Sequence, residues 1–277
     1  MKEKDLLSIM KFSIINLDKP TGPTSFQVSQ FVKNLLSLNK TSHLGTLDPQ
    51  VSGVLPIALG RACRLSDFFM HRDKEYIGIM RLHTNVSEQN LKKEMQSFVG
   101  KITQLPPVRS RVKRAERIRE VKLFQLLEKE GKDVLFKAEV QAGTYIRKLC
   151  DDLGKQTGGA HMLELRRIKA GIFSEETSIT LYDLERALND YKNGNESQLR
   201  KILIPAEEAI KKILPSVQIK EKSLRQILTG KPITKSDIIN PIPAGDHLAL
   251  FHNNQLIAIV HKVAEGDIIA RSDFVVN

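Results

Sequence analysis

One carboxylate in the chain stands in a setting that could suit chemistry. Residues 43–49, HLGTLDP, place Asp48 between a Gly-Thr turn and a proline. The surrounding loop, from Ser42 to Gly53, has too little apolar periodicity to be a helix or a strand, and the proline fixes the backbone just after the carboxylate. Asp48 is therefore a candidate catalytic group if other side chains reach it. Without such partners the same pattern is a plain Asx turn or a helix cap.

A second candidate is the arginine of residues 143–147, GTYIR, which follow a strand pattern and open a helix. Arg147 falls in the first turn of that helix, where the helix dipole favours anions over cations. The position therefore predicts a specific anionic partner for Arg147. A solvated side chain is the alternative.

Clustered cations form two further candidates. Residues 109–119, RSRVKRAERIR, hold six cations and one anion in eleven positions. This segment follows a Pro-Pro pair and lacks apolar periodicity, which favours an arm that contacts phosphates over a solvated helix face. Residues 160–169, AHMLELRRIK, contain a smaller cluster on the edge of a strand or a helix.

Two common kinds of site are excluded by the local sequence. No glycine-rich loop ends in Gly-Lys-Ser/Thr, as a phosphate-cradling Walker loop does. The seven histidines are scattered singly, and the two cysteines, Cys63 and Cys150, cannot form a cysteine-based zinc cluster or a disulfide scaffold. We therefore expect neither a metal nor a nucleotide cofactor.

The elements that must position these residues alternate between strands and helices. Thr24 and Gln27 form a capping box before a helix whose apolar stripe runs from Val28 to Leu36. Apolar patterns predict strands over 13–17, 76–83 and 133–140, and helices over 87–99, from 146, over 181–188 and over 205–214. They interleave without a regular βαβ period, which predicts an α+β fold with a mixed, mainly antiparallel sheet and flanking helices.

The pattern changes after Pro215. Short β-rich runs over 248–251, 256–260 and 267–270 are separated by Gly-Asp and Asn-Asn turns, which predicts a small β-barrel of about 60 residues. We therefore expect two domains, 1–210 and 211–277, of which the first carries the candidate catalytic residues.

Composition narrows the partners. The 277 residues are 41% hydrophobic and 27% charged, with a formal net charge of +11, so the chain can bury a core and suits a polyanionic partner or simply a soluble surface. Aromatic content is 5% without tryptophan, which argues against recognition by rows of stacked bases. The N-terminus lacks a cleavage site and no apolar run could span a bilayer. We expect a cytoplasmic protein that contacts no membrane.

The order of the motifs is more specific than any one of them. It resembles the motif series of the TruB/dyskerin pseudouridine synthases from residue 14 to residue 175, with a weaker similarity to a PUA domain at the C-terminus. The motifs are NLDKPTGPTS (16–25), HLGTLDP with VSGVLP (43–49 and 51–56), KEY (74–76), GTYIR (143–147) and HMLELRR (161–167). Residues 104–119 and 160–171 look more like the archaeal dyskerin type, which acts in H/ACA guide ribonucleoproteins, than like bacterial TruB.

This resemblance implies a reaction. A uridine is flipped out of RNA, its N1–C1′ bond breaks, the uracil turns, and C5 joins C1′, which requires no cofactor and no metal. Asp48 corresponds to the family's catalytic aspartate, which attacks C1′ or assists glycal formation. Arg147 corresponds to the arginine that pairs with it, and Tyr76 to the tyrosine that lies against the flipped base and takes a proton.

The resemblance also implies binding residues. His43 matches a histidine that fills the space of flipped-out nucleotides, Leu165 matches the apolar residue that closes the pocket, and Lys19 supports the active-site loop. Packing and loop anchoring are equally good interpretations of Leu165 and Lys19. The cations expected to bind RNA are Arg109, Arg111, Lys113, Arg114, Arg166 and Arg167.

Three functions stay open at this point. The first is an RNA-guided synthase that works with H/ACA RNA and small accessory proteins on rRNA, and also on the T-loop uridine of tRNA. The second is a stand-alone synthase of the TruB kind that modifies tRNA, and the third is a non-catalytic RNA-binding scaffold. We favour the first. Because Asp48 comes early in the chain, we expect an N-terminal extension that packs on the PUA region to be largely missing.

Overall fold

The computed structural model describes residues 5–105 and 115–276. The chain divides into two compact units, which we describe separately: a larger one, Ile15–Leu203, and a smaller one that joins Met1–Ile14 to Ile204–Asn277. Within the described ranges, none of the helices combines the length and the apolar character needed to cross a membrane.

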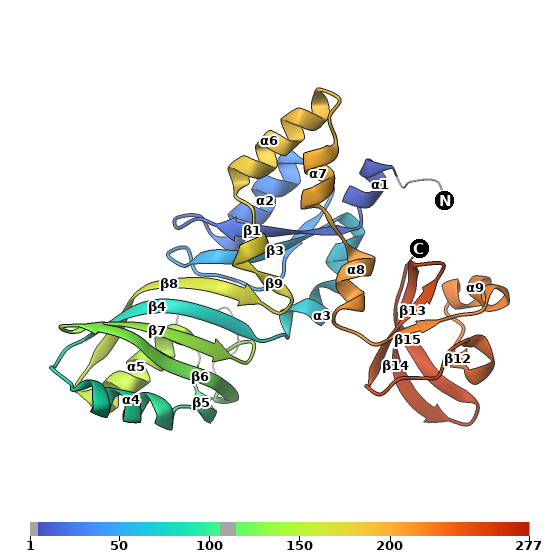
Figure 1. Ribbon diagram of the computed structural model, residues 1–277. Helices are drawn as coiled ribbons and strands as arrows, with labels where there is room; N and C mark the ends of the chain where they lie inside the picture. The colour runs from blue at the N-terminus through green and yellow to red at the C-terminus, as the bar shows by residue number, and fades with distance from the viewer. Residues whose placement is uncertain (1–4, 106–114, 277) are drawn as a thin grey trace. The chain divides into compact units, whose positions relative to one another are not determined.

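A large, mainly antiparallel sheet forms the framework of the larger unit (Figure 1). Its strands are β1 (Ser13–Lys19, which begins in the smaller unit), β2 (Thr41–His43), β3 (Ser52–Leu59), β4 (Lys74–Leu82), β5 (Gly100–Gln104), β6 (Arg117–Glu130), β7 (Asp133–Val140), β8 (Ala160–Ala170) and β9 (Phe173–Ser174). The order is β1-β3-β8-β4-β7-β6-β5, with β2 beside β3 and β9 beside β8. The pairing of β3 with β8 is parallel, which makes the sheet mixed, as predicted.

Helices cover this sheet and connect its strands. They are α2 (Ser25–Leu35), α3 (Ser66–Met70), α4 (Glu88–Ser97), α5 (Ile146–Thr157), α6 (Leu181–Lys192) and α7 (Ser197–Ile202), with 3₁₀ turns η1 (Gly60–Leu65) and η2 (Glu175–Thr177). Helix α5 packs on β8, and α4 packs on β6 and on α5 (Figure 1). Every second residue of β7 is buried, so one face of the strand is covered by other parts of the protein and the other face is more exposed.

Each strand and helix predicted in the larger unit coincides with an observed one, but several elements, among them β5, β9, α3 and α7, were not predicted. The Thr24–Gln27 capping box is formed at the start of α2, and β7 has the predicted bounds. Strand β3 was not predicted. Its side chains are buried on both faces between β1 and β8, so the run SGVLPIAL shows no alternation and carries a proline.

The predicted arm over 109–119 is wrong at its C-terminal end, because Arg117 already belongs to β6. There the strand pairs with β5, Gln104 opposite Arg117 and Ile102 opposite Arg119. Backbone pairing at the edge of a sheet needs no apolar side chains, so the charged run concealed a strand. Residues 106–114, which include four of the predicted RNA-binding cations, lie outside the described residues.

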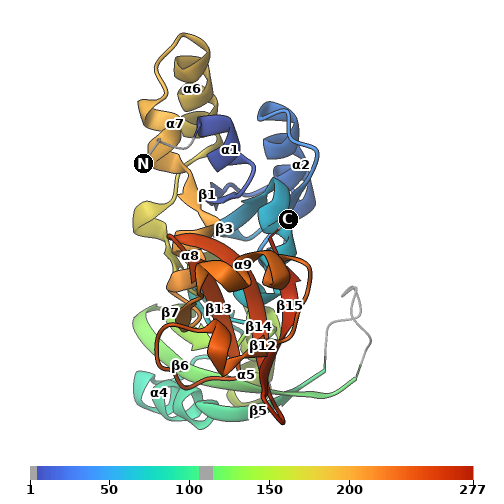
Figure 2. The same cartoon turned by 90° about the vertical axis from the view of Figure 1, so that its right-hand side faces the viewer.

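The smaller unit is built on a second, curled sheet (Figure 2). The order of its strands is β11-β13-β14-β15-β12. Its elements are α1 (Leu6–Met10), β10 (Ile204–Pro205), α8 (Ala206–Lys211), β11 (Ser216–Gln218), α9 (Glu221–Leu228), β12 (Ile233–Thr234), η3 (Lys235–Asp237), β13 (His247–His252), β14 (Gln255–Glu265) and β15 (Ile268–Val275). The three strands predicted after Pro215 are β13, β14 and β15. Strands β11 and β12 and helix α9 were too short for the sequence to indicate.

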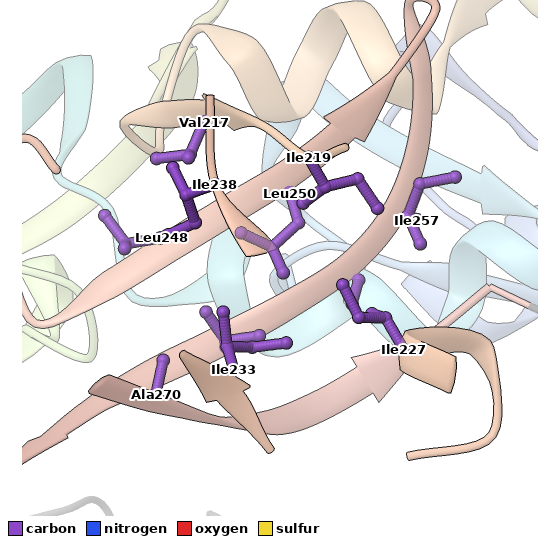
Figure 3. Close-up of a cluster of buried hydrophobic side chains, with 11 residues drawn as sticks. Val217, Ile219, Ile227, Ile233, Ile238, Leu248, Leu250, Ile257 and Ala270 are labelled. Carbon is purple, nitrogen blue, oxygen red and sulfur yellow. The ribbon is translucent and has the colours of Figure 1, made fainter. Parts of the chain in front are cut away.

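Apolar side chains on the inner surface of this sheet form a core of their own (Figure 3). Leu248, Leu250 and Val260 come from the long strands, and Ile227 comes from α9. Because the core is complete within these elements, the smaller unit has its own source of hydrophobic stabilisation. The α+β fold class predicted from the sequence is confirmed.

Candidate active site

The structure brings Asp48 and Arg147 together, although 99 positions separate them in the chain. Arg147 lies in the first turn of α5, and its Nη2 donates a hydrogen bond to Asp48 Oδ2. The side chain of Asp48 is 54% exposed and that of Arg147 is 46% exposed, so the ion pair is open to an incoming ligand. The predicted pairing is present, and its role in catalysis stays a prediction.

Lys19 holds the loop that carries Asp48. Its side chain is fully buried, and its Nζ donates to the carbonyl oxygens of Pro20 (2.7 Å), Pro49 (3.1 Å) and Val51 (2.9 Å). Burial lowers the pKa of this ammonium, and the nearby charge of Asp48 opposes that shift. Two of the three bonded carbonyls follow Asp48 within three residues, so the cation fixes the backbone just after the carboxylate.

Ser25 holds the same loop from the other side. Its Oγ accepts a hydrogen bond from the Leu47 N–H and donates one to the Leu47 carbonyl, both at 2.8 Å. Ser25 is buried at the start of α2. Ser25 lies in the NLDKPTGPTS motif, but its local sequence does not signal this role, because a serine after a helix N-cap is ordinary.

Tyr76 and Arg167 face each other across the pairing of β4 with β8. The guanidinium of Arg167 interacts electrostatically with the Tyr76 side chain, and it donates to the carbonyls of Val54 (2.7 Å) and Gly45 (3.0 Å). Burial lowers the pKa of Arg167, whereas Tyr76 raises it. Because Gly45 lies three residues before Asp48, Arg167 ties the tyrosine to the candidate catalytic loop.

The prediction that Arg167 binds RNA is corrected by this geometry. Its side chain is 1% exposed, and its donors are used by protein groups, so it cannot reach a phosphate in solvent. Glycine suits position 45 because its φ is +124°, which side chains rarely adopt; a Cβ there would only be in ordinary contact with Arg167 Nη1, at 3.5 Å. The sequence alone did not show that the arginine faces inward.

Lys74 is a third buried cation in this region, after Lys19 and Arg167. Its Nζ donates to the carbonyls of Met70 (2.5 Å) and Arg72. Burial and the charge of Arg167 lower its pKa to about 8, against the opposing effect of Asp73. The residue stands in the KEY motif beside Tyr76, yet nothing in its local sequence signals its burial.

Of the remaining predicted residues, the three that the structure describes lie on strands of the same sheet. His43, in β2, has a buried Nδ1 that lacks a hydrogen-bond partner among the residues the structure describes. Burial and the charge of Arg167 lower the pKa of His43. Leu165 is buried on β8 over Gly78, whose absent Cβ would lie 2.9 Å from Leu165 Cδ1. Arg166 donates to both carboxylate oxygens of Asp18 and to Glu175, each at 2.9 Å.

Taken together, these contacts build a half-exposed carboxylate with a guanidinium partner and a tyrosine tied to its loop. A carboxylate fixed in this way can attack an electrophilic carbon or stabilise a developing positive charge. Arg109, Arg111, Lys113 and Arg114 lie outside the described residues, and the RNA-binding role of Arg166 stays a prediction.

Two family models match the chain in succession. The model for the TruB family pseudouridylate synthase N-terminal domain covers residues 33–146, and the model for the tRNA pseudouridylate synthase B C-terminal domain covers residues 147–211. The chain is 44% identical over 248 residues to a probable tRNA pseudouridine synthase B of Methanopyrus kandleri, covering 88% of this chain and 73% of that protein. The homologue of Thermococcus onnurineus is 45% identical over 257 residues, covering 90% and 77%.

Solved structures agree with these matches. The Cbf5 chain of a Cbf5–Nop10–Gar1 complex superposes with a TM-score of 0.91 at 39% identity, covering 99% of this chain and 88% of that one. A chain of an H/ACA ribonucleoprotein bound to a substrate RNA containing 2′-deoxyuridine superposes with a TM-score of 0.88 at 37% identity, with the same coverage. The chain therefore belongs to the TruB family of pseudouridylate synthases, isomerases that act on uridine in RNA.

Proposed function

We propose that Asp48 is the carboxylate that acts at C1′ of a flipped-out uridine, by attack or by assisting glycal formation. The observation that carries this proposal is its ion pair with Arg147, formed across 99 positions of sequence. The guanidinium keeps the carboxylate aimed while leaving it about half exposed to an incoming sugar. The loop bonds from Lys19 and Ser25 keep the backbone in place during the reaction.

The proposed reaction balances within the substrate. The N1–C1′ bond breaks, the uracil turns within the pocket, and a C5–C1′ bond forms; C5 then loses its proton and N1 gains one. Asp48 leaves C1′ as it arrived, so it is regenerated. Tyr76 lies against the base, and on the glycal route it takes a proton from C2′ of the sugar and returns it when the C5–C1′ bond forms; the buried Arg167 interacts with its side chain. Leu165 closes the pocket and His43 fills the space that flipped nucleotides vacate.

We place this reaction in an RNA-guided particle. The similarity to Cbf5 extends over 99% of the chain, and those structures are a complex with Nop10 and Gar1 and an H/ACA ribonucleoprotein with bound substrate RNA. By analogy, this chain works with an H/ACA guide RNA and small accessory proteins, on rRNA and on the tRNA T-loop. A basic, cytoplasmic RNA-modifying enzyme fits its net charge of +11.

The division of labour follows the sequence prediction. Residues 1–210 carry catalysis, and residues 211–277 form a PUA-like domain that binds RNA. The curled sheet and separate core of the smaller unit support a domain of this kind. The basic residues Arg109, Arg111, Lys113 and Arg114, with Arg166, supply phosphate contacts.

A second function has its own support. The curated relatives from Methanopyrus kandleri and Thermococcus onnurineus are both named probable tRNA pseudouridine synthase B, which favours tRNA as the substrate. Action on tRNA without a guide is therefore the second candidate. A non-catalytic scaffold is disfavoured, because such a protein has no need of Asp48, Tyr76 and Arg147 together.

The experiment that separates these functions measures pseudouridine formation with purified protein. Transfer RNA transcripts labelled with tritium at uridine C5 are incubated with the protein alone and then with guide RNA and accessory proteins. Tritium release that requires the guide supports the guided reaction. Full release from tRNA with protein alone establishes the stand-alone enzyme, and no release under either condition refutes both.

A further inference from the structure

The side chain of Gln104 is bonded at both ends to the backbone of one residue in the turn that carries Arg147. Gln104 is the last residue of β5 and is 2% exposed. Its Nε2 donates to the Tyr145 carbonyl (3.2 Å), and its Oε1 accepts from the Tyr145 N–H (2.9 Å). The two bonds fix the peptide planes on both sides of Tyr145.

Tyr145 is the N-cap of α5 and accepts no capping bond with its own side chain. In a capping box, the third residue of the helix bonds to the amide of the N-cap. Here Gln104 makes that bond from a different strand, 41 positions earlier in the chain. The Tyr145 carbonyl also accepts the first helical bond, from Leu149 N–H at 3.0 Å. Gln104 therefore joins the beginning of α5 to the sheet.

Other contacts in this turn come from within it or cover it. Thr144 bonds to the Gln141 carbonyl through its N–H (3.2 Å) and its Oγ1 (2.8 Å). A Cβ on Gly143, where φ is +81°, would lie 3.2 Å from the Arg119 guanidinium. The two bonds from Gln104, by contrast, hold the backbone of Tyr145, the residue at which the helix begins.

The orientation of Arg147 depends on this start. Arg147 is two residues beyond Tyr145, and the helix dipole does not favour a cation in the first turn. A rotation of the Tyr145 peptide planes would swing the guanidinium away from Asp48. Displacements of about 1 Å at a reacting group can lower a rate by about a hundredfold.

We propose that Gln104 is a positioning residue for the Asp48–Arg147 pair and that it acts on the reaction through Arg147. This inference rests on the proposed function, in which that pair is catalytic. Gln104 itself touches neither substrate nor the reacting atoms. Its removal affects the chemical step, while RNA binding through phosphate contacts is retained.

The test compares Gln104→Leu, which removes both bonds, with Thr84→Val as a matched control. Thr84 Oγ1 donates to the Thr157 carbonyl at the opposite end of the same helix (2.6 Å). Single-turnover tritium release should fall by about ten- to a hundredfold in Gln104→Leu, with RNA affinity within about threefold of the parent. Thr84→Val should release tritium at the parental rate.

A double-mutant cycle with Arg147→Lys then tests the route of the effect. If Gln104 acts through Arg147, Gln104→Leu should lower the rate of tritium release by a markedly smaller factor in the Arg147→Lys variant than in the parent protein. Losses that add fully, an unchanged rate, or a loss of RNA affinity without a loss of rate would each overturn the proposal. If Asp48→Asn keeps full activity, the proposed function fails instead, which the cycle alone would not reveal.

A second variant keeps the proposal testable if Gln104→Leu does not fold. Gln104→Glu keeps the acceptor for the Tyr145 N–H but sets a carboxylate against the Tyr145 carbonyl, so its rate should be reduced at neutral pH. Protonation of the introduced carboxyl restores a donor, so its rate relative to the parent should rise as pH falls. A ratio that is constant with pH contradicts the proposal.

Discussion

Replacing the buried Lys19 with methionine tests how the candidate loop is held. The change keeps the length of the side chain but removes the ammonium that bonds the carbonyls of Pro20, Pro49 and Val51. The Val51 carbonyl belongs to a buried residue, whereas Pro20 and Pro49 are exposed and water can replace the donor there. A hydrogen bond to a charged group contributes about 1.5–3 kcal/mol, so loss of the Val51 bond gives a local destabilisation of at most about 3 kcal/mol. Lys19→Met also removes a buried ammonium, whose desolvation is unfavourable, so the net destabilisation is at most this value.

The effect should be local, because all three carbonyls lie within or beside the loop that carries Asp48. A change of about 3 kcal/mol corresponds to about a hundredfold increase in the population of the open loop. Hydrogen exchange in a peptide over residues 44–55 should therefore accelerate by up to about a hundredfold. Single-turnover tritium release should fall at least about tenfold, because Asp48 loses its aim.

Matched measurements decide whether the reasoning is correct. Exchange in a peptide over residues 181–192, which form α6, serves as the internal control and should not change. Unchanged exchange and an unchanged rate in Lys19→Met would show that the loop is held by other contacts. A uniform acceleration across the larger unit would show that Lys19 stabilises the fold as a whole rather than the loop.

Three further predictions concern charge. Burial raises the pKa of Asp237, but hydrogen bonds from Thr234, Lys231 and Ser223 bring it below its ordinary value. The ionised carboxylate therefore stabilises the folded state above the pKa of the unfolded state, and this stabilisation is lost as pH falls through the pKa of the folded state. Asp237→Asn should lower the stability of the smaller unit by about 2 kcal/mol at pH 7, and the gap should narrow in acid unfolding curves. The pKa of Lys74 is lowered to about 8, so the unfolded state binds more protons above that pH and stability should rise by about 3 kcal/mol between pH 8 and pH 10.5. A Lys74→Met variant that keeps the same rise in denaturant titrations would contradict that assignment. Neutralising Arg111, Lys113 and Arg114 together should flatten the salt dependence of RNA binding by about one unit of slope per lost phosphate contact, and an unchanged slope would mean that these side chains are only solvated.

Part of this site is predictable from the sequence because the informative features are local. The HLGTLDP loop and the GTYIR turn each contain their own turn residues, and the order of the motifs indicates that they converge. The residues themselves predicted only an anionic partner for Arg147, and the resemblance to the TruB/dyskerin family identified that partner as Asp48. The α+β class follows from interleaved helix and strand periods.

The direction of a side chain is harder to predict, as Arg166 and Arg167 show. Neighbouring residues of a strand point to opposite faces, so one arginine of the pair had to face inward. The pairing of β8 with β4 shifts register at two places. The inward-facing residues of β8 therefore cannot be identified by simple alternation along the sequence. Burial of Arg167 thus became visible only with the carbonyls of Gly45 and Val54 that receive its donors.

Long-range polar contacts were beyond sequence reasoning for a different reason. Gln104 is an ordinary polar residue at the end of a short strand, and its partner, Tyr145, lies 41 positions away. Lys74 and Ser25 are equally ordinary in their local sequence. Such residues bond to backbone atoms, which every residue possesses, so no pattern of side chains reveals their partners.

Conversion of uridine by the Asp48→Asn variant tests the central claim most directly. The substitution keeps the size of the side chain and removes its charge, and the released tritium from C5-labelled RNA reports the reaction itself. We predict that release is abolished while RNA affinity stays within about tenfold of the parent, because one carboxylate contributes little to a phosphate-dominated interface. Release at the parental rate would show that another group acts at C1′.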